Sequence, residues 1–312
     1  MAIAGSNLGE ASSVMFGSNH AKSFSVESQG SITATAPPGA GMVDVTVTVP
    51  DTGVTATSPA DLFTYANPPQ LGRCVPSARR KGEFKNAQCT KSGHGKGKDN
   101  WLAGPGPKAE FTSTLSAPVL ESTGASTIRI TCTAGKAEGE YTGAQTLKVT
   151  NLTFSGCAES PRKAGVASDC QGTGLANGEI VTNELAGEVG FISRVGRKRT
   201  VGLDLRGPGS GALADFECGG ASGVTGKGTG AGTARELDGS VIGKLKTINL
   251  MSASNVVTYQ AIGGHQVPER FEGALPDILT TLVGLEKTPE PTTFSATGEI
   301  TSEEAIEVNT VA

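Results

Sequence analysis

The three histidines of this 312-residue chain are its first candidates for catalytic chemistry, but each stands in an expected turn. His20 follows a Gly-Ser-Asn sequence, His94 lies in a stretch rich in glycine and lysine, and His265 follows a Gly-Gly pair. A serine-hydrolase triad needs a histidine that is held by a carboxylate and touches a nucleophile. Since the chain also contains no Gly-x-Ser-x-Gly nucleophile elbow, we predict that no histidine is catalytic.

Paired carboxylates are the second candidate, because folding can bring two of them together for glycoside hydrolysis whatever their separation in sequence. The later part of the chain offers Glu138, Glu140, Glu184, Glu188, Glu299, Glu303, Glu304 and Glu307. Sugar-cleaving sites are commonly lined by aromatic side chains, and aromatic residues make up only 4% of this chain. We therefore favour the alternative interpretation, in which these glutamates occupy solvent-facing strand positions.

Metal and phosphate sites lack a matching motif. The chain contains no Asp-x-Asp-x-Asp-Gly calcium loop. The glycine-rich stretch 219–228 holds a Gly-Lys pair, but glycine follows the lysine where a phosphate loop needs Ser or Thr. The sequence predicts no catalytic residue, no metal site and no cofactor, and we expect the protein not to be an enzyme.

The six cysteines all follow residue 70 and form no Cys-x-x-Cys pair: Cys74, Cys89, Cys132, Cys157, Cys170 and Cys218. An even count without nearby histidine favours disulfides over zinc. Six cysteines allow 15 sets of pairings. Cys132 shares an expected strand face with Ile130, and Cys218 shares one with Phe216, so among these sets we favour a Cys132–Cys218 bridge across a core. Cys157 stands at a strand end, which favours the short loop to Cys170 and leaves Cys74–Cys89 as the third pair.

Disulfides indicate an oxidising compartment, so we expect an extracellular or cell-surface protein. The alternative is a cytosolic protein with six reduced, buried thiols. The first residues, Met-Ala-Ile-Ala-Gly-Ser, lack the basic start and apolar run of a signal peptide. An export signal is therefore expected upstream of Met1. No apolar run is long enough to span a membrane.

A basic segment is the best candidate for direct binding. Residues 71–110 carry a net charge of +6, whereas residues 1–70 and 111–312 are acidic and the whole chain is at −4. The cationic candidates are Arg79, Arg80, Lys81, Lys85, Lys91, Lys96 and Lys98, with Trp101 as a stacking surface. They suit an anionic polymer, such as a wall teichoic-type chain or an acidic polysaccharide. The alternative is a solvated, disulfide-closed loop that favours solubility.

The elements that position these residues are expected to be strands throughout. Val43, Val45, Val47 and Val49 alternate with polar residues, which is typical of a half-buried strand. Strands at intervals of roughly 8–12 residues over residues 1–67 predict a small β-sandwich. The proline pair at 68–69 marks its end. We predict three parts: a sandwich over 1–67, a basic connector over 68–110, and a larger disulfide-stapled β-domain over 111–312.

The first part resembles a known family through five landmarks: Gly5-Ser-Asn7-Leu8, Val14-Met-Phe16-Gly17, Thr35-Ala-Pro37-Pro38, Val43-Asp-Val-Thr-Val47 and Asp61-Leu-Phe63-Thr-Tyr65. Together they are similar to an IPT/TIG domain, an immunoglobulin-like sandwich found in bacterial surface proteins, plexin-type receptors and Rel-type transcription factors. The family usually begins with a strand ahead of the Gly-x-Asn-Leu segment, so we expect a missing first strand and further sequence upstream. DNA binding, as in the Rel branch, is disfavoured because this part holds one base against five acids.

The third part is expected to be an antiparallel sandwich or a barrel-like domain. Expected strands are 126–133, 146–154, 178–182, 188–193, 200–205, 213–218, 239–250, 255–262 and 304–311, and a tight hairpin turn is expected at Asp238-Gly239. Residues 272–284 fit a helix or a strand. This part loosely resembles uncharacterised Cys-containing regions of actinobacterial-type surface proteins. We predict an all-β, structural, adhesive or protein-binding molecule at the cell surface; the alternatives are a polymer-binding module and, less favoured, a glycan-active enzyme.

Overall fold

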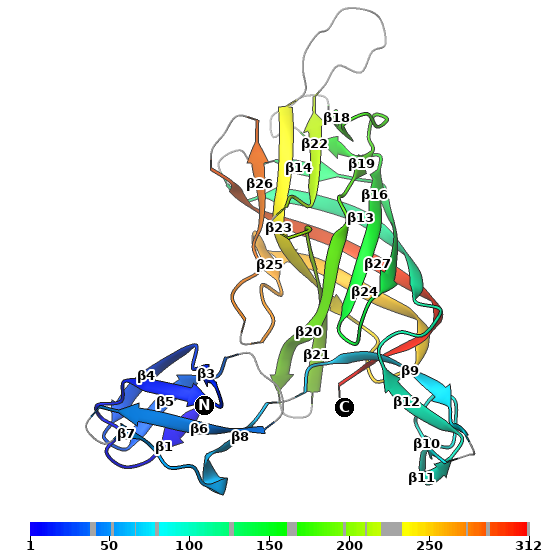
Figure 1. Ribbon diagram of the computed structural model, residues 1–312. Coiled ribbons are helices and arrows are strands. Elements are labelled where there is room, and N and C mark those ends of the chain that lie inside the picture. The colour runs from blue at the N-terminus through cyan, green and yellow to red at the C-terminus, as the bar shows by residue number, and fades with distance from the viewer. Residues whose placement is uncertain are drawn as a thin grey trace, which may run out of the picture. The chain divides into compact units, whose positions relative to one another are not determined.

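The computed structural model describes residues 1–37, 42–50, 53–65, 67–78, 81–124, 128–160, 167–195, 198–209, 211–219, 233–272, 274–284 and 288–310. The chain forms two compact units, and along the chain the first gives way to the second between Pro68 and Pro69. Both units consist of antiparallel strands (Figure 1). Of the described residues, none belongs to a helix long and apolar enough to cross a membrane.

The first unit is an immunoglobulin-like sandwich of two sheets, as predicted. One sheet holds β1 (Ala2–Ala4), β5 (Ser31–Thr35) and β4 (Ser23–Ser28). The other holds β3 (Asn19–His20), β2 (Ser13–Phe16), β6 (Met42–Val49), β7 (Gly53–Val54) and β8 (Leu62–Thr64), the last entered from a one-turn 3₁₀ helix η1 (Pro59–Asp61). Val45, Val47 and Val49 of β6 are buried in the core with Phe16, because alternate side chains of a strand face one side.

The second unit contains a closed antiparallel barrel. Of the two architectures expected from the sequence, a sandwich and a barrel-like domain, the strand pairing therefore shows the second. Eight strands pair in chain order and the last returns to the first: β13 (Glu110–Ser122), β15 (Ala134–Tyr141), β16 (Thr146–Ser155), β20 (Leu185–Val195), β21 (Lys198–Arg206), β23 (Thr233–Leu245), β24 (Ser252–Ile262) and β27 (Glu290–Asn309). Closure gives each of these strands two neighbours and so removes the free edges of the sheet.

Three strands of this barrel, β13, β23 and β27, continue into a second ring of shorter strands. That ring is completed by β14 (Arg129–Thr131), β17 (Ala158–Glu159), β18 (Ser168–Gly172), β22 (Ala214–Cys218) and β26 (Leu279–Val283). Two further strands are β19 (Ile180–Val181), which pairs with β16, and β25 (His265–Val267), which pairs with β24. The short-strand ring therefore shares a wall with the barrel (Figure 1).

Gly239 marks the place where β23 passes from one ring to the other. Its φ is +101°, and a Cβ added there would stand 1.9 Å from the carbonyl oxygen of Ile278. Residues 235–239 pair with β26, and residues 240–244 pair with β21. The expectation of a hairpin turn at Asp238-Gly239 is therefore wrong, because the glycine bends a continuous strand where β26 approaches closely.

The basic segment forms a small sheet continuous with the barrel. Its order is β9 (Gln70–Pro76), β12 (Asp99–Ala103), β10 (Gly82–Phe84) and β11 (Ser92–Gly97). β9 also pairs with the end of β27, where Gly72 lies opposite Glu307. The segment was expected to be a separate connector; in the structure it groups with the second unit because β9 extends that unit's sheet.

The strand predictions differ from the structure mainly where small residues replace the usual apolar ones. Residues 110–122 and 134–141 form β13 and β15, which were not predicted, and their inward faces include Ser113, Gly135 and Ala137. Within 272–284 the described structure contains strand β26 rather than a helix. The extra hydrogen-bond partners supplied by barrel closure compensate for weak local strand propensity.

Candidate functional site

All six cysteines form disulfides, and the pairs are Cys74–Cys89, Cys132–Cys157 and Cys170–Cys218. The first pair agrees with the prediction and the other two do not. The register places Cys170 directly opposite Cys218 on adjacent strands β18 and β22, with Cα atoms 4.1 Å apart. Cys132 and Cys157 follow and precede the paired strands β14 and β17. The prediction that Cys132 and Cys218 face the core is confirmed. However, each disulfide joins neighbouring strands instead of crossing the core.

These two bridges lie in a compact apolar cluster of the short-strand ring. Ile128, Ile130, Ile180 and Phe216 pack around them, and Cys157, Cys170 and Cys218 are all buried. Glu159 lies near Cys170 and Cys218 and gives, in the described part of the chain, the one grouping of three potential metal ligands. Because both sulfur atoms are already bonded to each other, this group supplies no thiolate for a metal.

The basic hairpin, residues 81–98, is built by its own polar and glycine residues. Asn86 Oδ1 accepts hydrogen bonds from the backbone N–H groups of Thr90 (3.2 Å) and Lys91 (2.8 Å), and the buried Cys89 ties the same loop to Cys74. Gly97 lies so close to β10 that a Cβ there would stand 2.0 Å from the carbonyl oxygen of Phe84. The Asn86 hydrogen bonds and the Cys74–Cys89 disulfide therefore hold the loop between β10 and β11, and the close approach of Gly97 to Phe84 holds the two strands together.

The described lysines of this hairpin are exposed: Lys81, Lys85, Lys91, Lys96 and Lys98. The backbone N–H of Lys85 donates to the carbonyl of Lys91, so these two residues lie opposite each other where β10 and β11 lead into the loop. Where the structure describes the chain, none of the five has a carboxylate within 4.0 Å. Like charges that lie opposite each other repel, so an anion that bridges them would be stabilising. Arg79 and Arg80 lie outside the described residues.

Trp101 does not stand beside these lysines as a free stacking surface. It lies on β12 opposite Cys74, and its ring covers the backbone of Gly72, where an added Cβ would meet Cζ2 at 2.2 Å. Burial raises the pKa of the neighbouring Glu307. Only part of the ring is accessible, so the lysines are the more exposed half of the predicted site.

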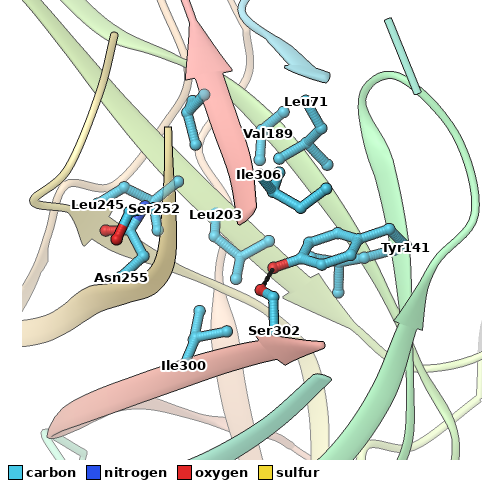
Figure 2. Close-up of a pocket in the computed structure, with 12 residues that line it drawn as sticks. Leu71, Tyr141, Val189, Leu203, Leu245, Ser252, Asn255, Ile300, Ser302 and Ile306 are labelled. Atoms are coloured by element: carbon cyan, nitrogen blue, oxygen red, sulfur yellow. Dashed lines mark hydrogen bonds between the residues drawn. The ribbon is translucent and has the colours of Figure 1, made fainter. Parts of the chain in front are cut away.

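The barrel interior is filled by side chains. One cavity in this interior has a volume of about 20 Å³, and in it the Tyr141 hydroxyl lies 2.8 Å from Ser302 Oγ. Figure 2 shows this pair on one side of the cavity, with Ser252 and Asn255 on the other side. That volume holds about one water molecule. Burial raises the pKa of Tyr141. The hydroxyl is therefore a neutral, paired group at this end of the interior.

An open groove on the outer face of β13, β15 and β27 gathers four glutamates. Its volume is about 570 Å³, and it is lined by Glu110, Glu138, Glu140 and Glu303. Lys148 bridges Glu140 (3.3 Å) and Glu184 (3.4 Å), and both carboxylates raise its pKa. All of these glutamates except Glu110 were among the carboxylates predicted as candidates. A general acid is kept protonated at neutral pH by burial, whereas these side chains are exposed or half-buried.

The other predicted glutamates are dispersed. Glu188 pairs with Arg206 at 3.2 Å, and Glu304 Oε1 accepts the Gly106 N–H at 3.0 Å. Glu299 Oε1 lies 3.5 Å from Ser254 Oγ. Their environments are those of ordinary structural carboxylates.

The histidines are exposed. Ser13 Oγ lies 3.3 Å from His20 Nδ1, and His265 Nδ1 lies 3.5 Å from Glu269. These are two separate pairs, one in each unit, and a triad needs all three groups together.

Asp204 is the group with unusual electrostatics that sequence analysis missed. It sits on β21 between inward-facing leucines and points to the outer side of the barrel wall, yet its exposed fraction is 3%. Oδ2 is 3.4 Å from Arg206 Nη1, and Oδ1 is buried without a hydrogen-bond partner. Burial raises its pKa to about 7, assisted by Asp277 and opposed by Arg206. The sequence does not indicate this burial, because an acidic residue that alternates with apolar residues on a strand is expected to face solvent.

Comparison with known proteins identifies the first unit. Residues 1–65 match the IPT/TIG domain.

This match confirms the predicted resemblance of the sandwich, and it accords with the two-sheet structure described above. No curated protein and no solved structure matches the chain significantly. The predicted likeness of the third part to actinobacterial-type surface proteins stays a prediction. IPT/TIG domains often occur in extracellular adhesion or binding proteins, and together with three disulfides this is consistent with an extracellular location.

Proposed function

We propose that the protein is an extracellular or cell-surface molecule with a structural, adhesive or protein-binding role and no enzymatic activity. The supporting observation is the pairing of an IPT/TIG sandwich with a disulfide-bonded barrel whose candidate carboxylates lie on its outer wall. Rigid sheets of this kind present surfaces to partners. In contrast, an enzyme would hold its reacting groups in a cavity that excludes water.

Surface location and adhesion are testable on the cells that produce the protein. Protease treatment of intact cells is expected to remove most of the protein, and deletion of its gene is expected to reduce attachment of the cells under flow several-fold. The control is a cytosolic protein that survives the same treatment. Recovery of the chain from the cytosol with six free thiols, or unchanged attachment, would contradict the proposal.

A second candidate role is binding of an anionic polymer by the basic hairpin, and the five exposed, unpaired lysines specifically favour it. Poly(glycerol phosphate) and polygalacturonate are suitable probes of the two polymer classes. The four-fold variant in which Lys85, Lys91, Lys96 and Lys98 become Ala is expected to bind at least tenfold more weakly at low salt. Binding to the native protein is expected to fall steeply between 0.05 and 0.5 M NaCl, because salt screens exposed charges.

The matched control replaces four exposed lysines elsewhere in the second unit, Lys136, Lys198, Lys244 and Lys246, by Ala. Both variants lose the same net charge. Equal loss of binding in the two variants would indicate non-specific attraction, and unaltered binding in the hairpin variant would remove the polymer-binding role.

A further inference from the structure

Two adjoining apolar cavities lie inside the second unit, toward its short-strand ring. Their volumes are about 60 Å³ and 50 Å³. They share the lining residues Phe154, Thr182, Leu237 and Phe294. Close packing normally leaves few voids larger than a water molecule, so space of this size in the described interior is a feature that a ligand can use.

The unusual group in these cavities is the Thr182 hydroxyl. Its Oγ1 is buried and has no hydrogen-bond partner. Four other described side chains have an unpaired buried atom, and none of them lines either cavity: Tyr65, Trp101, Asp204 and Arg235. Thr182 shares the inward strand face with Ile180, which lines the larger cavity. A buried hydroxyl of this kind lacks the partner that such groups normally find.

The lining defines the chemistry of an occupant. No charged side chain borders either cavity, and Phe154, Phe216, Phe294 and Tyr259 supply aromatic surface. Burial raises the pKa of Tyr259, so its hydroxyl is neutral. Benzene occupies an apolar protein cavity of about 150 Å³, and these two cavities together measure about 110 Å³ (60 and 50 Å³), so one ring that spans both is the largest occupant they fit. The occupant is therefore small, neutral and mostly apolar, with a single polar group.

We propose that the two cavities form a binding site for a small phenol or aromatic alcohol, whose hydroxyl pairs with Thr182 Oγ1 and whose ring packs among Phe154, Phe216 and Phe294. This site is independent of the basic hairpin and of any adhesive role. It lies in the interior of the second unit, whereas the proposed adhesive and polymer-binding roles involve only the surface.

Phenol and toluene test the proposal, because they have nearly the same size and differ in the hydroxyl. Each is titrated into the intact, oxidised protein while the methyl NMR signals of Ile130, Ile180 and Leu237 are followed. Phenol is expected to bind at least fivefold more tightly than toluene. In Thr182→Val, which keeps the shape and removes the hydroxyl, this preference is expected to disappear.

Two further variants complete the test. Ala214→Leu fills the larger cavity, which Ala214 lines, and is expected to abolish binding of both compounds. Thr142→Val removes an exposed threonine hydroxyl that bonds to Thr146, and it is expected to change nothing. The proposal is overturned if neither compound shifts the methyl signals of the native protein, if toluene binds as well as phenol, or if Thr182→Val keeps the preference. The Thr182→Val comparison alone decides the question if Ala214→Leu fails to fold.

Discussion

Replacing Asp204 by Asn is expected to raise the free energy of unfolding at pH 8 by about 4 kcal/mol and to leave it nearly unchanged at pH 4. The pKa of this carboxyl is raised from 3.8 to about 7 in the folded protein. Each unit of difference between the folded and unfolded pKa contributes about 1.4 kcal/mol. Burial is the main cause of the shift, because Oδ1 is enclosed without a partner.

The sign follows from proton uptake. The folded state holds the proton more tightly than the unfolded state, so the carboxyl stabilises the fold fully below pH 4 and loses that contribution as the pH rises toward 7. Native protein is therefore expected to become less stable between pH 4 and pH 7. The amide of the Asp204→Asn variant cannot ionise, so the unfolding free energy of that variant is expected to vary less over the same window.

Urea unfolding at pH 4, 6 and 8, with disulfides intact and Trp101 fluorescence as the probe of the second unit, measures this effect. Asp215→Asn is the matched control, because Asp215 lies on a strand of the same unit and is exposed. It is expected to leave the pH dependence unchanged. An Asp204→Asn protein with the native pH dependence would show that Asp204 is ionised and accommodated in the fold.

Replacing Cys170 and Cys218 together by Ala is expected to lower the free energy of unfolding by about 4 kcal/mol. The bridge closes a loop with a sequence separation of 48, and a cross-link stabilises mainly by restricting the unfolded chain. Loss of Cys74–Cys89, with a separation of 15, is expected to lower it by about 3 kcal/mol on the same basis. Both double variants are compared with native protein by urea unfolding at pH 6.

The two double variants also separate local from unit-wide effects. Cys170 and Cys218 lie in the apolar cluster of the short-strand ring, so their loss is expected to weaken the whole second unit. Cys89 lies in the loop of the basic hairpin, and loss of its bridge is expected to release that loop first. A larger destabilisation from the hairpin pair would contradict this assignment, and a non-reducing peptide map that recovers a Cys132–Cys218 peptide would contradict the pairing itself.

The candidate sites show where sequence reasoning reaches its limit. The basic segment was visible from charge alone, and its lysines are exposed as expected, whereas the partial burial of Trp101 against Gly72 depends on how β9 pairs with β12. Asp204 had no signal, because a polar residue that alternates with apolar ones on a strand normally faces water. Thr182 shares a strand face with Ile180, but nothing in the sequence indicates that its hydroxyl lacks a partner. Their burial comes from segments distant in the chain that cover them.

The amino-acid sequence by itself determined the all-β class, the IPT/TIG sandwich and the presence of disulfides. These follow from local properties: the period of two in Val43–Val49, turn residues at short intervals, and an even number of cysteines in inward-facing positions. Tertiary structure alone decided that the second unit closes into a barrel, which cysteines bond, and where polar groups are enclosed. Closure and register depend on pairing between residues as far apart as Phe111 and Ser302. The two-residue alternation along a strand indicates which face a side chain occupies, but it does not indicate which strand lies beside it.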